Sequence, residues 1–231
     1  MRDLTDYQPR EIPGRKTLTG RLATLYPYDP AAHGLGLAAA VGGPGNAETW
    51  RYMPFEPFPA GEAFIPAFNA VALDRGWSPY VITDKASDTI LGTASYMRLR
   101  PEHGSCEVGC VAFGSELKRT AYASEAMYLM AAHVFDDLRY RRYEWKCHNQ
   151  NAASKMAAAR FGFRFEGIFR NDMVMKGQSR DTAWFAMTDA DWPQIKADFE
   201  TWLSPSNFDA DGQQKTSLSA LRARHQHQQQ Q

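Results

Sequence analysis

Apolar positions in the central part of the chain recur with two different periods, which separate β-type segments from helical ones. Runs that alternate in polarity or are rich in β-branched and aromatic residues predict strands over 22–26, 80–84, 90–99, 106–113, 142–147, 163–169 and 182–187. Apolar residues three or four positions apart predict helices over 31–41, 62–73, 121–138 and 151–160. The helix over 121–138 has the most regular pattern of these.

The connections between these segments indicate the type of sheet. Short polar turns join the strands at 80–84, 90–99 and 106–113, which favours an antiparallel meander. Strands and helices then alternate until the last two strands follow each other directly. The sequence therefore predicts an α/β fold with a mixed, mostly antiparallel central sheet and helices on both faces.

The two ends of the chain lack this periodicity. Residues 1–20 mix prolines and charges and predict an arm laid over the surface. Residues 204–231 are rich in Ser, Asn, Asp, Gly and Gln, a composition that predicts a disordered tail with at most a helical turn near residue 218. The folded domain is expected over 21–203.

Charge and composition narrow the range of partners. Lys plus Arg and Asp plus Glu both number 26, so the chain has no net positive field to attract nucleic acid or an anionic membrane. No apolar run approaches the roughly 18 residues of a membrane span, and residues 1–15 do not resemble a secretory signal. We expect a cytoplasmic protein with neither nucleic acid nor membrane as partner.

Three cysteines cannot all pair within one chain, and their spacing matches neither a redox motif nor a zinc site. Cys106, Cys110 and Cys147 are predicted to be reduced and buried. No metal is expected.

The junction between the strand at 106–113 and the helix at 121–138 has the features of an anion site. The first turn of a helix presents free N–H groups, and small residues let a phosphate approach the main chain. Ala121, Ala123 and Ser124 are small, and Lys118 and Arg119 add positive charge. An ordinary capped helix with a solvated basic pair remains an alternative, because the mononucleotide and dinucleotide fingerprints are absent.

Asn151 and Ser154 mark the start of the next helix. Both polar side chains are expected at the rim of its N-terminus, where they border the same cleft if the two helices flank adjacent strand ends. A purely structural cap is the alternative.

Taken together, the motifs over about 22–187 resemble those of the GCN5-related N-acetyltransferases, in the branch similar to the ribosomal-protein alanine acetyltransferases. The matching segments are Glu107-Val-Gly109, residues 118–126, residues 142–146, Asn151 with Ser154, Gly162-Phe163, Glu166-Gly167, Arg170 and Arg180-Asp181. The resemblance implies a splayed strand pair in the sheet and transfer of an acetyl group from acetyl-CoA to an amine.

The resemblance also implies a set of residues that bind acetyl-CoA. The strand end is expected to bind the pantetheine arm, the basic loop the pyrophosphate, and the second helix the thioester end. The residues are Val111, Ala112, Phe113, Lys118, Arg119, Thr120, Ala121, Tyr122, Ala123, Ser124, Asn151 and Ser154. The loop departs from the family pattern at position 121, where alanine replaces glycine, and one methyl group is tolerable if φ there is negative.

Catalytic roles follow from the chemistry of amine acetylation. Glu107 is the candidate base, because strand alternation places it on one face with Gly109, Val111 and Phe113. An ion-paired carboxylate without a catalytic role is the alternative. Ser154 is the candidate for hydrogen bonding or protonating the departing sulfur.

The acceptor is expected to be a primary amine of a small molecule or peptide. Trp50, Tyr52, Met53 and Phe55 could form an apolar acceptor wall, although simple packing explains them equally well. A non-catalytic acetyl-CoA sensor and a purely structural subunit are the alternative functions. Monomer and homodimer are equally compatible with the sequence.

Overall fold

One mixed sheet forms the centre of the fold. The computed structural model describes residues 3–118 and 120–228. Among these residues an eight-stranded sheet has the order β1-β2-β3-β4-β5-β6-β8-β7. The strands are β1 (Leu18–Thr19), β2 (Ala23–Pro27), β3 (Ser78–Asp84), β4 (Ile90–Arg100), β5 (Ser105–Phe113), β6 (Arg142–His148), β7 (Arg164–Met175) and β8 (Gln178–Thr188). Only β5 and β6 are parallel neighbours within this sheet, so the predicted mixed, mostly antiparallel sheet is confirmed.

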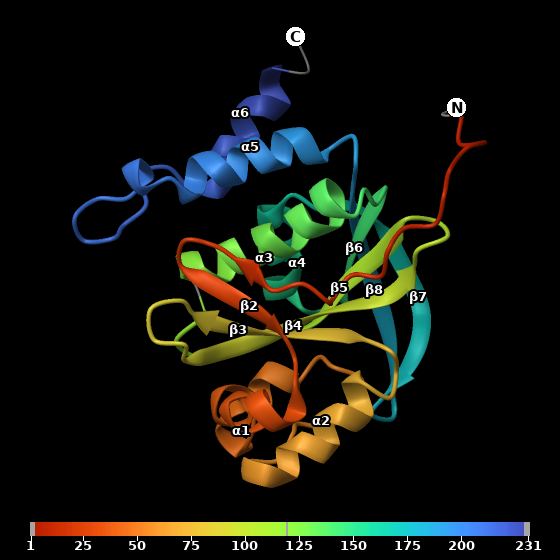
Figure 1. Ribbon diagram of the computed structural model, residues 1–231. Helices are drawn as coiled ribbons and strands as arrows, with labels where there is room; N and C mark the ends of the chain where they lie inside the picture. Colours follow the sequence, from red (N-terminus) through yellow and green to blue (C-terminus); the bar gives the residue numbers. More distant parts are fainter. Residues whose placement is uncertain (1–2, 119, 229–231) are drawn as a thin grey trace.

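Helices cover both faces of the sheet (Figure 1). The helices are α1 (Pro30–Val41), α2 (Phe64–Ala72), α3 (Ala121–Ala132), α4 (Ala152–Phe161), α5 (Trp192–Leu203) and α6 (Leu218–Gln228). α1 and α2 lie on one side and α3 and α4 on the other, with α5 and α6 stacked beyond α3. Each side therefore has its own hydrophobic cluster, a larger one under α3 and α4 and a smaller one under α1 and α2.

Local signals in the sequence explain where the helices begin and end. Asp29 caps α1 by accepting hydrogen bonds from the N–H groups of Ala31 and Ala32. Gly162 ends α4 in the left-handed conformation, with φ of 97°. The predicted helix over 121–138 is regular only as far as Ala132 and continues as a π-helical turn at His133–Asp137, in which the Leu138 N–H bonds the His133 carbonyl (3.0 Å).

The parallel pair β5 and β6 separates partway along its length. Pairing runs from Ser105 with Arg142 to Val108 with Trp145 and then stops, although both strands continue. This is the splayed strand pair that the sequence predicted. One backbone edge of β5 beyond Val108 is therefore not paired with β6.

A β-bulge in β5 changes which side chains share a face. Between the pairs Thr93–Ala112 and Ser95–Gly109, β5 has one more residue than β4, and Cys110 has φ of 48°. Cys106 consequently packs in the cluster under α3, whereas Cys110 packs under α1 and α2. The expectation that Glu107 shares a face with Val111 and Phe113 is wrong, because the bulge reverses the alternation between them. All three cysteines are buried and free, as predicted.

The C-terminal part of the chain contains structure that the sequence did not predict. Leu218 and Leu221 of α6 belong to the larger hydrophobic cluster. Arg222 donates from Nε to the carbonyl of Arg160 (2.7 Å) and lies 3.6 Å from a carboxylate oxygen of Asp198. The structure thus differs from the expected disordered tail, because a few apolar residues within the polar segment find space against α4 and α5.

The packing of α6 can be tested by core truncation. Leu218 has no exposed surface, so Leu218→Ala should lower the free energy of unfolding by about 2–5 kcal/mol. Leu35→Ala, at a helix position that is 57% exposed, should change it by less than about 0.5 kcal/mol. Chemical denaturation of both variants measures the difference, and equal stabilities would show that α6 does not pack in solution.

Candidate active site

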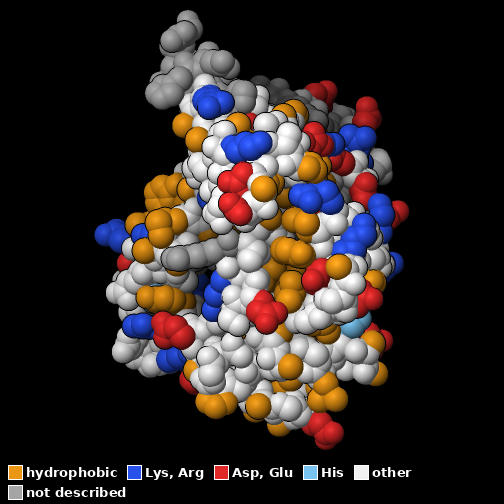
Figure 2. All heavy atoms as spheres, turned by 90° about the vertical axis from the view of Figure 1, so that its left-hand side faces the viewer, with side chains coloured by type: hydrophobic (Ala, Val, Ile, Leu, Met, Phe, Trp, Pro, Cys, Tyr) orange, Lys and Arg blue, Asp and Glu red, His pale blue; other side chains and the backbone are white. Residues whose placement is uncertain are grey.

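A cleft of about 1270 Å³ opens where β5 and β6 separate. Figure 2 shows the side of the molecule on which α3 begins, where hydrophobic side chains gather around a hollow. Most predicted site residues line the cleft: Tyr52, Met53, Phe55, Glu107, Val111, Phe113, Lys118, Thr120, Ala121, Tyr122, Ala123, Ser124, Asn151 and Ser154. The fold therefore brings together residues that lie about a hundred positions apart in the chain.

Two predicted residues, both described, do not line the cleft, contrary to expectation. Trp50 is fully buried; its indole N–H donates to the carbonyl of Val41 (2.8 Å) and its ring packs against Phe58, so it supports the wall from behind. Ala112 is also fully buried, in the cluster under α1 and α2. Arg119 lies outside the described residues.

The N-terminus of α3 forms one end of the cleft. Thr120 caps the helix: its hydroxyl donates to the carbonyl of Leu117 (2.8 Å) and accepts from the N–H of Ala123 (3.4 Å). Lys118 reaches the hydroxyl of Thr49 (3.1 Å) and so ties the loop to the neighbouring turn. Ala121 is the first helical residue, so its φ is negative and the position does not require glycine. The alanine that departs from the family pattern is thus compatible with this backbone.

The start of α4 forms the opposite wall. Asn151 accepts from the N–H of Ser154 (3.0 Å), so it is the helix cap that the sequence predicted. The Ser154 hydroxyl accepts from the indole N–H of Trp145 (3.0 Å), which orients its oxygen. That hydrogen bond uses the oxygen as acceptor, and the hydroxyl itself forms a side-chain hydrogen bond with Cys147 that partly offsets the burial raising the pKa of this thiol.

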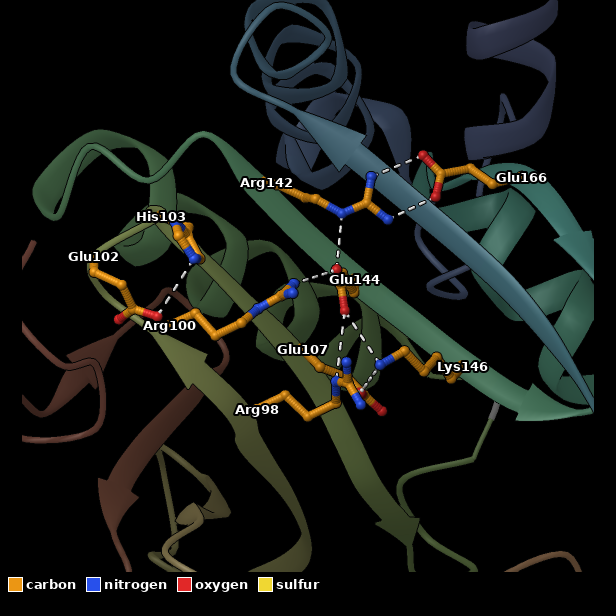
Figure 3. A network of polar contacts seen from close by, with 9 residues as sticks. All are labelled: Arg98, Arg100, Glu102, His103, Glu107, Arg142, Glu144, Lys146 and Glu166. Carbon is orange, nitrogen blue, oxygen red and sulfur yellow. Dashed lines mark hydrogen bonds and ion pairs between the residues drawn. The ribbon is translucent and has the colours of Figure 1, made fainter. Parts of the chain in front are cut away.

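Glu107 lies in a buried network of charges on the face opposite α3 and α4 (Figure 3). Its Oε2 accepts from Lys146 (2.7 Å), and Lys146 also lies 3.2 Å from Glu144. Glu144 in turn accepts from Arg100 (2.7 Å) and Arg142 (2.8 Å). Alternation along β6 explains why Glu144 and Lys146 share this face. The sequence did not predict their contact with Glu107, because that contact depends on the parallel pairing of β5 with β6.

The two buried carboxylates differ in their electrostatics. Burial raises the pKa of Glu107, and the opposing attraction of Lys146 and Arg98 does not cancel that effect. Burial also disfavours charged Glu144, but hydrogen bonds from Arg142 and Lys146 outweigh it and lower its pKa. Glu107 is therefore the more basic carboxylate of the pair, and it is the one that lines the cleft.

The acceptor wall and the far end of the cleft include segments from distant parts of the chain. The ring of Tyr52 lies 5.3 Å from that of His148 at the end of β6. Trp202, Phe208 and Gln214 line the cleft from the C-terminal side. The indole N–H of Trp202 donates to the side-chain oxygen of Gln214 (2.8 Å). The sequence did not predict this C-terminal wall, because nothing in the polar segment signals its contact with the domain.

Comparisons with known proteins agree with this geometry. Residues 36–164, more than half of the chain, match the family described as acetyltransferase (GNAT) domain. A GCN5-related N-acetyltransferase from Brucella melitensis is 41% identical, with a TM-score of 0.89 over 95% of this chain and 100% of that one. The chain belongs to the GNAT family.

Other GNAT relatives extend the comparison. A probable acetyltransferase of the GNAT family from Chromobacterium violaceum is 36% identical, with a TM-score of 0.77 over 84% of this chain and 96% of that one. The uncharacterized N-acetyltransferase p20 of Bacillus licheniformis is 26% identical over 62% of this chain and 81% of its own length. As a GNAT protein the chain is an N-acetyltransferase, and its fold implies acetyl-CoA as co-substrate.

The side chains and helix lengths of the described residues bear on two further features, a metal site and a membrane-spanning helix. No group of three or more His, Cys, Asp or Glu side chains suited to a metal ion occurs in the part of the chain that the structure describes. Among the helices of residues 3–118 and 120–228, none has both the length and the apolar character needed to cross a membrane.

Proposed function

We propose that the protein transfers the acetyl group of acetyl-CoA to a primary amine of a small molecule or peptide, directly within a ternary complex. The observation that carries the proposal is the cleft itself. The cleft joins a helix N-terminus, an unpaired strand edge and a buried carboxylate in one continuous space. Acetyl-CoA supplies the activated acetyl group, and the residues of the chain bind it, orient it and accept the amine proton.

The N-terminus of α3 suits the pyrophosphate. Its first N–H groups and the helix dipole favour an anion, and the small side chains of Ala121 and Ala123 leave the main chain accessible. Lys118 adds positive charge at the mouth of the cleft. The edge of β5 beyond Val108 offers backbone groups to the pantetheine amides and, near Val111, an N–H to the thioester carbonyl.

Glu107 is our candidate for the base. An amine with a pKa near 10.4 costs about 4.6 kcal/mol to deprotonate at pH 7, whereas an α-amine near 7.8 costs about 1 kcal/mol. Lys146 occupies Oε2 of Glu107, whereas Oε1 lies beside Gly109, where an added Cβ would be 3.3 Å from that oxygen and would clash with Met97. Oε1 is therefore the atom that would accept the proton, directly or through water.

Direct transfer is favoured over a covalent acetyl-cysteine. Cys110 and Cys147 both line the cleft, but burial raises the pKa of Cys110 to about 12 and raises that of Cys147 as well. The nucleophilic thiolate is thus disfavoured at both positions. The finer predictions of a branch similar to the ribosomal-protein alanine acetyltransferases, a cytoplasmic location, and a monomer or homodimer stay predictions.

Calorimetry with acetyl-CoA tests the proposed cofactor site. The full chain should bind with micromolar affinity, and Ala121→Glu should abolish binding, because its carboxylate would meet the pyrophosphate. Ala159→Glu, at an exposed position of α4 away from the cleft, is the matched control and should bind normally. No binding by the parent chain, or equal binding by both variants, would contradict the proposed site. Binding without thiol release for any amine would indicate the alternative, a non-catalytic sensor.

The role of Glu107 predicts a change in pH dependence. A base acts deprotonated, so activity falls as the pH drops through its pKa. Lys146→Met removes a charge that lowers the pKa of Glu107, so the acid limb of kcat/KM should move up by about 1 pH unit or more. Glu107→Gln should lose about 100-fold or more in kcat and lack this limb. Profiles with one amine for all three proteins measure the effect, and coinciding acid limbs would rule out Glu107 as the base.

Ser154 can be tested through its hydroxyl. If this group assists departure of the CoA thiolate, Ser154→Ala should lower kcat by about tenfold while the KM for acetyl-CoA stays the same. Ser154→Thr, which keeps a hydroxyl, should retain most of the activity. Steady-state kinetics checks both, and unchanged turnover in Ser154→Ala would remove the role.

A further inference from the structure

Three residues of β8 present polar atoms to the cleft from one face of the strand. Arg180, Thr182 and Trp184 alternate along β8 and all line the cleft. The intervening residues Ala183 and Phe185 pack in the cluster under α3 and α4. Alternation therefore places the three polar side chains on the same face as Glu107 and Lys146, opposite α3 and α4.

Each of these three side chains has a buried polar atom that finds no hydrogen-bond partner among residues 3–118 and 120–228. These atoms are Nε of Arg180, Oγ1 of Thr182 and Nε1 of Trp184. Arg180 is only 7% exposed and Thr182 only 2% exposed. Three adjacent orphaned groups that line one cleft indicate a ligand that completes their hydrogen bonds, because buried polar groups are normally paired.

Arg180 differs from the other arginines of this face. Arg98, Arg100 and Arg142 each form ion pairs with Glu107, Glu144 or Glu166. No carboxylate among the described residues forms an ion pair with Arg180, whose NH1 contacts only the sulfur of Met175, at 3.7 Å. Burial lowers the pKa of Arg180, and an anionic ligand would offset that desolvation.

The surroundings of Arg180 leave its charge available to a ligand. Asp172 lines the cleft, and its charge opposes the effect of burial on the pKa of Arg180, but this carboxylate is exposed and forms no ion pair with Arg180. Burial and the charge of Arg180 both lower the pKa of His148, so that ring is neutral at pH 7. The ring of Trp184 stacks on Phe169 (4.4 Å) and carries Lys146 over its face (3.8 Å), which fixes the direction of its N–H.

We propose that the amine acceptor is a small molecule that also carries a carboxylate, and that Arg180 binds this carboxylate. Thr182 and Trp184 donate further hydrogen bonds to the same group. A planar guanidinium matches a carboxylate through two parallel hydrogen bonds. This inference rests on the proposed acetyl transfer and adds the class of acceptor.

One molecule can engage both ends of this arrangement. Lys146, which bonds Glu107, lies opposite Trp184 in the register of β6 and β8, and Glu107 and Arg180 both line the same cleft. An amine placed at Glu107 would thus leave a nearby carboxylate within the region of Arg180. Amino acids and related amino carboxylates have this combination of groups.

Matched acceptors test the inference. Each amino acid is compared with its carboxamide and its decarboxylated amine in a thiol-release assay. The wild-type protein should prefer the carboxylate by about 10- to 100-fold in kcat/KM. Arg180→Gln should remove this preference by slowing the carboxylate alone, Arg180→Lys should retain part of it, and Lys176→Gln on the exposed hairpin tip should keep it. Equal rates for acid and amide in the wild type, or an equal loss for all acceptors in Arg180→Gln, would overturn the inference.

A binding measurement provides a readout that does not require turnover. Calorimetry compares an N-acetyl amino acid, the product, with its amide for the wild type and Arg180→Gln. The acid should bind about 10-fold or more tightly than the amide only when Arg180 is present, and equal binding would overturn the inference. Normal acetyl-CoA binding by Arg180→Gln shows that the variant is folded. If the wild-type protein did not bind acetyl-CoA, the proposed function itself would be refuted.

Discussion

The separation of β5 from β6 is the constraint on which the rest of the site depends. Parallel pairing ends at Val108 and Trp145, and neither strand edge is bonded to the other beyond that point. An unpaired strand edge inside a protein needs other hydrogen-bond partners. The cleft lies there, with α3 beginning at one end and α4 at the other. One interruption of the sheet thus provides the backbone groups, the space and the two helix N-termini of the proposed acetyl-CoA site.

The same parallel pairing determines the charges of the acceptor side. Glu107 lies opposite Glu144 in the register, and Lys146 bridges the two carboxylates. Burying like charges together is costly unless cations accompany them. Burial raises the pKa of Glu107 in spite of Lys146, whereas hydrogen bonds from Arg142 and Lys146 lower the pKa of Glu144, so two chemically identical groups differ in their ability to accept a proton. Arg180, which lacks such a partner among the described residues, completes this face as an anion-binding group.

Local sequence patterns were reliable where the structure depends on neighbouring residues. Each predicted strand and helix is present, and Asn151 caps α4 as its position indicated. The strand alternation in β5 gave a wrong prediction where one extra residue forms a bulge. The bulge at Cys110 puts Glu107 and Val111 on different faces, and no local feature of the sequence marks it. The prediction for the polar C-terminal segment differed from the structure for another reason: Leu218 and Leu221 pack in the core but are too few to give a periodic signal.

By itself the sequence determined the class of fold, the positions of the helix caps, the small residues at 121 and 123, and the resemblance to acetyltransferases. These features depend on periodicity and on residues close together in the chain. Tertiary structure alone decided where β5 and β6 part, that Lys146 meets Glu107, that Trp202 and Phe208 line the cleft, and that Arg180 forms no ion pair with a carboxylate of the described residues. Those features join residues tens of positions apart, and their energies come from burial and strand register, which no local pattern encodes.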